Sequence, residues 1–154
     1  MRRLPFFAFL LLIAINGADA QELARVEACL AAKADNNKAT PNFSECVGIT
    51  LDDCMDRPGG ATTLGIVECH KAETAAWDVL LNRYYKQAQI GLSAELITSL
   101  RDVQRSWITF RDLSCRFAYD WAGGGTIRGP LAADCLLRKT AEQALWLKVW
   151  AEER

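Results

Sequence analysis

A regular pattern of apolar and polar positions begins at Ser93 and ends at Trp121. Its apolar side chains recur at steps of three, four and seven residues, which is the spacing of one α-helical face. They are Leu96, Leu100, Val103, Trp107, Phe110, Phe117 and Trp121. The adjoining column is more polar and consists of Ile97, Arg101, Gln104, Ile108, Arg111 and Cys115. We therefore expect a long helix that Ser93 caps and that ends before glycines 123–125, with its apolar face toward a core.

Four more helical segments are predicted by residues that begin and end helices. They are residues 22–34, a short helix from the Thr40–Pro41 start signal to about Met55, a long one from Thr62 or Thr63 to Ile90, and a last one from near Pro130. No alternating strand pattern of useful length appears. We predict an all-α, disulfide-stapled bundle of three longer helices packed together, with a short N-terminal helical pair.

The first twenty residues have the layout of a secretory signal peptide. Two arginines precede an apolar run, and Ala18-Asp19-Ala20 offers a small-residue cleavage site. An uncleaved anchor is the alternative, but the apolar run is short of the about 20 residues that span a membrane. We expect cleavage after Ala20, no membrane anchor and a single exported domain over residues 21–154.

The charge balance argues against a nucleic-acid partner. Residues 1–20 contain two arginines and one aspartate, so the remaining 134 residues hold 16 basic and 18 acidic side chains, a net charge of −2. Such a balanced chain offers no broad basic surface for nucleic acid or an anionic membrane.

Six cysteines in an exported chain predict a disulfide framework. Their spacing fits neither a zinc site nor a redox motif, and His70 is the only histidine, so we expect no metal and no cofactor. Six cysteines allow fifteen connectivities. The simplest joins neighbours along the chain: Cys29 with Cys46, Cys54 with Cys69, and Cys115 with Cys135.

Polar side chains lie at the edges of the predicted helical faces. They are Glu73, Asp78, Asn82, Tyr85, Gln104, Arg111, Asp112, Arg138 and Glu142. Their opposite charges predict an interhelical network in which Glu73 or Asp78 meets Arg111 or Arg138. The network either fixes the helix register, the best-attested use of buried ion pairs, or lines a binding or acid–base cleft.

Catalytic motifs are absent from the sequence. No nucleophile elbow, phosphate loop or zinc-protease motif occurs. Asp52 and Asp53 could suit glycoside hydrolysis, but neighbouring residues on a helix point in different directions. We therefore expect no catalytic residues and no enzyme activity.

Two surface features could meet a partner. Asp52, Asp53 and Asp56, together with Glu45, form a modest acidic patch. The segment from Trp121 to Pro130 combines tryptophan, glycines and Arg128, and tryptophan and arginine are common interface anchors. The alternative for each is an ordinary solvated surface.

Residues 69–145 resemble the lysozyme inhibitor LprI-like N-terminal domain family. The resemblance rests on Cys69-x3-Glu73, Asp78-x2-Leu81-Asn82-x2-Tyr85, Gln104-Arg105-x-Trp107-x3-Arg111-Asp112-x2-Cys115, Gly124-Gly125-Thr126-Ile127, Cys135, Arg138 and Leu145. It implies a small helical, disulfide-bonded protein of the bacterial envelope, either periplasmic or secreted. The matching positions are expected to define the fold.

The resemblance leaves three functions open. The first is a lysozyme inhibitor, whose acidic patch would speed association with basic lysozymes. The second is an envelope interaction or stability protein that binds another periplasmic protein without affecting lysozyme. An envelope hydrolase comes third.

Overall fold

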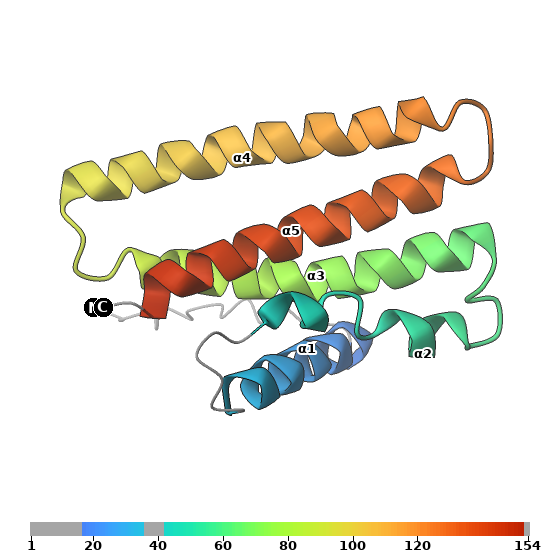
Figure 1. Ribbon diagram of the computed structural model, residues 1–154, viewed down its shortest axis with the longest axis horizontal. Coiled ribbons are helices and arrows are strands. Elements are labelled where there is room, and N and C mark those ends of the chain that lie inside the picture. Colours follow the sequence, from blue (N-terminus) through green and yellow to red (C-terminus); the bar gives the residue numbers. More distant parts are fainter. Residues whose placement is uncertain (1–16, 36–41, 153–154) are drawn as a thin grey trace, which may run out of the picture.

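Two long helices, α3 (Thr63–Ala88) and α5 (Arg128–Glu152), lie side by side and form the centre of the molecule (Figure 1). The computed structural model describes residues 17–35 and 42–152. On one side α4 (Ala94–Trp121) packs against α5, and on the other α1 (Gly17–Asp35) packs against α3. A 3₁₀ turn, η1 (Phe43–Cys46), and the short α2 (Leu51–Met55) lead to α3. No strand occurs in these residues, which confirms the all-α prediction.

The core lies where α1, α3 and α5 meet. Trp77 and Leu80 of α3 are fully buried, as is Leu147 of α5, and α1 adds Val26 and Leu30. Small side chains let the central helices approach closely; the buried alanines are Ala76, Ala88, Ala133, Ala141 and Ala144. Burial of each large apolar side chain contributes about 1.5–3 kcal/mol to folding.

The predicted caps of the two longest helices are confirmed. The Thr62 hydroxyl accepts a hydrogen bond from the Gly65 amide at 3.0 Å, and the Ser93 hydroxyl accepts one from the Leu96 amide at 3.3 Å. These bonds satisfy amide groups that the first turn of a helix leaves without partners. α3 ends at Ala88, two residues before the expected Ile90. Gly91, in the turn that follows, has a φ of 75°.

The expected single helix from Pro41 to Met55 is wrong. η1 and α2 are separated by a turn over residues 47–50, in which Gly48 has a φ of 88°. Glycine adopts this left-handed backbone without a side-chain clash, and the helix cannot continue through it. The proposed start at Thr40–Pro41 lies outside the described residues.

All three predicted disulfides are present. Cys29–Cys46 joins α1 to η1, Cys54–Cys69 joins α2 to α3, and Cys115–Cys135 joins α4 to α5. Their Cα atoms are 5.8, 5.7 and 5.4 Å apart, within the normal range. Each bond closes a short loop and contributes roughly 3 kcal/mol in the chain-entropy model.

The rotation of α4 differs from the expectation. Gln104 and Cys115, from its more polar column, are buried, whereas Leu96, Val103, Phe110, Phe117 and Trp121 are each at least 42% exposed. No Cα atom of α4 lies within 8 Å of one in α3, so α4 rests on α5 alone among the longer helices. The strip of α4 that faces α5 draws on both columns, because Leu100 and Trp107 pack against the core beside Gln104 and Cys115. Contact with a single helix buries only this narrow strip.

The predicted signal peptide lies largely outside the described residues. Residues 17–20 form the first turn of α1, so the expected cleavage site after Ala20 falls within this helix. None of the described helices combines the length and apolar character needed to cross a membrane.

Candidate functional site

The carboxylate of Glu73 connects α3 to the turn before α2. It is fully buried and accepts four hydrogen bonds. Oε1 accepts from the Gly48 amide at 2.6 Å and from Trp77 Nε1 at 3.1 Å. Oε2 accepts from the Thr50 amide at 3.0 Å and from the Thr50 hydroxyl at 2.8 Å. Glu73 therefore holds the N-terminal segment on α3.

The expected ion-pair network between helices is wrong. Arg138 donates from Nε to Asp134 at 2.9 Å, and this hydrogen bond, together with the Asp134 charge, raises the pKa of Arg138. Arg111 pairs with Asp112 at 2.8 Å. Each of these pairs lies within one helix and is partly exposed, so neither ties α3 to its neighbours.

Asp78 also has its partner within its own helix. Its Oδ2 accepts from Asn82 Nδ2 at 3.0 Å.

The guanidinium of Arg111 has a second contact within α4. It lies 5.0 Å from the centre of the Trp107 ring, a distance at which the cation and the ring attract each other.

Six of the predicted motif residues line one open groove between α3 and α4, which we call the motif groove. They are Asp78, Asn82, Tyr85, Gln104, Trp107 and Arg111. The groove has a volume of about 400 Å³ and exists because both helices rest on α5 without approaching each other. Gln104 is 8% exposed, and its Nε2 has no hydrogen-bond partner within the described part of the chain. The groove can bind polar groups, and the ionisable side chains of Asp78, Tyr85, Arg105 and Arg111 are among its lining.

His70 lies in the interface between α3 and α5. Its Nδ1 is 2.7 Å from the Ile66 carbonyl and donates to it, and its Nε2 faces Asp134 at 3.7 Å. The ring therefore has a packing role between two helices. Across residues 17–35 and 42–152, no group of three potential metal ligands gathers.

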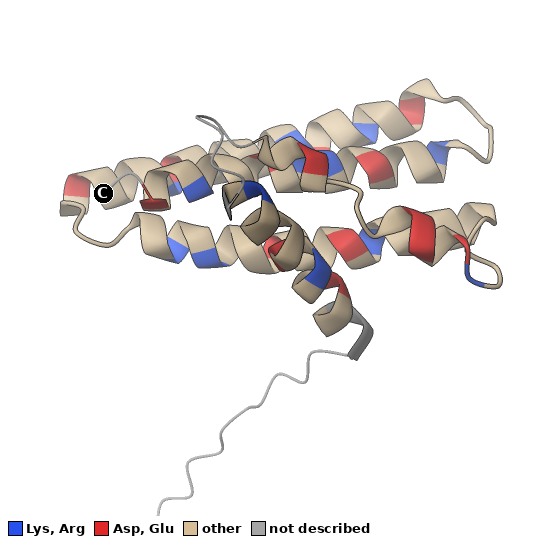
Figure 2. Cartoon of the chain, turned by 60° about the horizontal axis from the view of Figure 1, so that its bottom comes forward, with Lys and Arg blue, Asp and Glu red and all other residues tan. Residues whose placement is uncertain are grey.

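The predicted acidic patch is partly neutralised by α1. Asp53 pairs with Arg25 at 2.7 Å, and Glu45 pairs with Lys33. Asp52 and Asp56 are exposed and form no ion pair with the other described residues. Figure 2 shows the acidic stretch at α2 beside basic positions of α1 and of the following turn.

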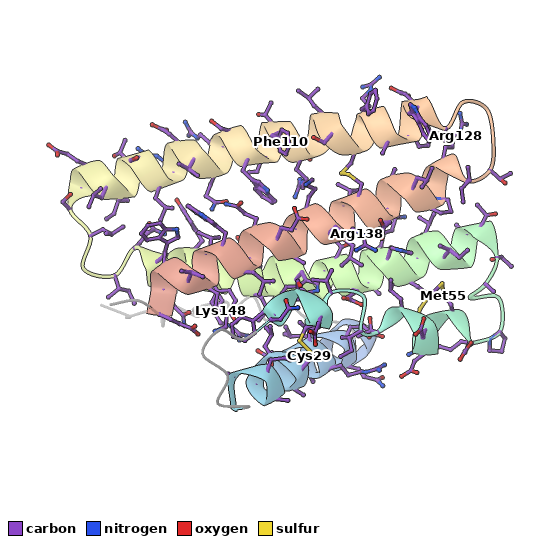
Figure 3. All side chains as sticks on the ribbon, in the orientation of Figure 1. Cys29, Met55, Phe110, Arg128, Arg138 and Lys148 are labelled. Atoms are coloured by element: carbon purple, nitrogen blue, oxygen red, sulfur yellow. A yellow bond between two sulfur atoms is a disulfide. The ribbon has the colours of Figure 1, made fainter. Side chains whose placement is uncertain are left out.

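Trp121 and Arg128 flank the connection between α4 and α5. Trp121 is 75% exposed, and the Arg128 guanidinium lies 4.6 Å from the centre of the Tyr119 ring. The Cys115–Cys135 bond fixes the base of this connection. Figure 3 shows the labelled Arg128 at the same end of the molecule as Met55 of α2. We call Asp52, Asp56, Trp121 and Arg128 the bundle-end surface.

Comparison with known families supports the resemblance found in the sequence. The lysozyme inhibitor LprI family matches residues 54–147, which include the residues of the motif groove and two of the disulfides. The match begins earlier than the expected residue 69. No curated protein and no solved structure matches the chain. Since the family match covers more than half of the sequence, the chain belongs to the lysozyme inhibitor LprI family.

Proposed function

We propose that this chain is exported by a bacterium and acts outside the cytoplasm by binding lysozyme and blocking its hydrolysis of the cell wall. The family match over residues 54–147 carries this proposal. Three disulfides that leave no free cysteine support an oxidising compartment, such as the periplasm or the exterior of the cell. Inhibition requires a stable binding surface, and no reaction has to be catalysed.

The bundle-end surface is the proposed contact with lysozyme. Lysozyme hydrolyses its substrate with two carboxylic acids in a cleft. A guanidinium such as Arg128 can pair with carboxylates, and the exposed Trp121 can bury a large apolar area beside it. Asp52 and Asp56 would attract the basic surface of a common lysozyme toward the same end.

A second function is an envelope protein that binds a different partner. The motif groove favours it, because the unpartnered amide of Gln104 lies among side chains that can donate and accept hydrogen bonds. Under this alternative the chain binds a polar group in the groove and does not affect lysozyme.

Direct binding to several lysozyme types, at low and moderate salt, tests the proposed contact. Arg128→Glu is expected to weaken binding at least tenfold by repelling the catalytic carboxylates. Asp52→Lys with Asp56→Lys is expected to slow association and reduce its salt dependence. Arg101→Glu, an exposed charge reversal near the other end of α4, is the matched control and should bind as the wild type does.

Equal binding by Arg128→Glu and the control would exclude the bundle-end surface as the contact. If Gln104→Leu alone weakened binding, the contact would lie at the motif groove. An absence of binding to every lysozyme type would exclude the proposed function itself.

A further inference from the structure

The flank of α4 that runs beside Trp146, Trp150 and Lys139 of α5 presents large apolar side chains to solvent at a spacing of seven residues. Leu96 is 55% exposed, Val103 42%, Phe110 57% and Phe117 68%. Figure 3 shows Phe110 near the middle of this helix. A repeat of seven residues keeps side chains on one stripe along a helix and is the pattern by which helices pack on one another. Within the described part of the chain the stripe stays largely exposed, with the Lys139 ammonium of α5 5.8 Å from the centre of the Phe110 ring.

Two tryptophans of α5 extend this stripe at one end. Trp146 and Trp150 are 39% and 48% exposed, and their rings pack edge to face with centroids 5.9 Å apart. Together with Leu92, Leu96, Leu100 and Val103 they line an apolar groove of about 360 Å³. We call this groove and the seven-residue stripe the α4 outer face.

The α4 outer face is larger than a monomer normally exposes. Its six most exposed large side chains are about half exposed, which amounts to roughly 600–700 Å² of apolar surface at about 150–250 Å² for a whole large side chain. Single soluble domains seldom show a contiguous apolar patch above about 300–600 Å². A stable interface buries about 800 Å² on each partner, of which a little over half is apolar. The face is therefore large enough for a stable protein interface.

The shape of the face favours a second copy of the same chain as its occupant. One end has the apolar groove, and the other end has the exposed ring of Phe117. A two-fold axis between Val103 and Phe110 would place two α4 helices antiparallel, with each Phe117 opposite the groove of the other copy. Such a two-fold contact uses the same patch twice and closes the assembly.

We propose that this chain forms an antiparallel homodimer through the α4 outer face. The dimer buries Leu96, Val103, Phe110 and Phe117 and seats each Phe117 against Trp146 and Trp150 of the second copy. Trp121 lies one turn beyond Phe117 on α4 and would border this contact, whereas Asp52, Asp56 and Arg128 lie outside it.

Sedimentation equilibrium over a wide concentration range tests this proposal. The chain is expressed with its complete N-terminus in an exporting bacterial host and purified with its disulfides intact. Wild type is expected to have twice the mass of one chain, and Phe117→Asp is expected to raise the dissociation constant at least tenfold. Leu64→Asp, at a 70% exposed apolar position of α3, is the matched control and should stay dimeric. Helical circular dichroism should be the same in all three proteins.

Cross-linking tests the antiparallel arrangement. Ser106 lies near the proposed axis, whereas two copies of Ser99 would stand roughly 20 Å apart at 1.5 Å of helix rise per residue. A short bis-maleimide should therefore join two Ser106→Cys chains and leave Ser99→Cys chains unlinked; equal linking of both would overturn the antiparallel arrangement.

A monomer at every concentration, or a dimer that Phe117→Asp leaves intact, would overturn the dimer proposal. If the chain is monomeric and its measured mass shows that residues 1–20 are still attached, the face would be assigned to that segment. A monomer in which only lysozyme binding responds to Phe117→Asp would assign it to lysozyme.

Discussion

At the scale of single residues, Glu73 shows how a family motif can serve the fold. Its position at the edge of a helical face, with opposite charges on other helices, suggested an arginine partner. The structure instead places two backbone amides, a hydroxyl and an indole around it. Backbone donors have no signature in the sequence, so these partners could not be predicted before the turn over residues 47–50 was known.

Replacing Glu73 by Gln is expected to lower the free energy of unfolding by about 1–3 kcal/mol. The amide retains one acceptor oxygen and turns a donor toward donors, which leaves buried N–H groups without partners. Urea unfolding measures the loss. Glu68→Gln removes only an exposed pair with Lys71 and serves as the control, with a change below about 0.5 kcal/mol. Equal stability of the two variants would contradict the role of Glu73.

Arg111 tests whether the motif groove stabilises the fold or binds a ligand. Arg111→Ala removes the contact with Trp107 and the pair with Asp112, and we expect a loss of about 1 kcal/mol in the free energy of unfolding. Lysozyme binding should not change, because the groove lies away from the bundle-end surface. A variant of full stability with altered binding would reveal a functional groove.

Tyr84 makes stability depend on alkaline pH. Burial, and to a lesser extent the Glu152 charge, raises the pKa of Tyr84 above 10.0. The folded state therefore holds the phenol proton more tightly than the unfolded chain. This contribution is complete below the unfolded pKa of about 10 and is lost as the pH rises through the folded pKa. Between about pH 9 and 11 the wild type should lose stability faster than Tyr84→Phe. Parallel profiles of stability against pH for the two proteins would argue against a raised pKa of Tyr84.

At the scale of helices, much of the structure could be predicted from local sequence. Thr62 and Ser93 cap α3 and α4 where expected, because capping depends on a few neighbouring residues. The rotation of α4 could not be predicted from periodicity, because both of its columns contain apolar side chains. The Cys115–Cys135 bond helps to decide between them, because it requires Cys115 to face α5.

α4 is expected to be the least stable of the longer helices. It buries only Gln104 and Cys115, and one disulfide holds it to α5. Changing Cys115 and Cys135 together to Ser should cost roughly 3 kcal/mol in the free energy of unfolding. Amide hydrogen exchange should then become fastest in α4 while α3 stays protected. Uniform loss of protection in α3 and α4 would show that α4 does not open separately.

At the scale of the whole molecule, the helices form a row in which α1, α3, α5 and α4 follow one another (Figure 1). The order was not readable from the sequence, since helical periodicity does not say which helix lies beside which. This order produces the motif groove on one side of α4 and its exposed outer face on the other. It also brings α2 and the connection after α4 to the same end of the molecule, at opposite edges of the row (Figure 1).

The central claim is that this chain inhibits lysozyme, and a lysis titration tests it most directly. The purified, oxidised chain is added to several lysozyme types while the clearing of a cell-wall suspension is followed. We predict that lysis by at least one lysozyme stops at a fixed molar ratio, and that Arg128→Glu raises the amount required while Arg101→Glu does not. Undiminished lysis with every lysozyme, at both low and moderate salt, would contradict the account.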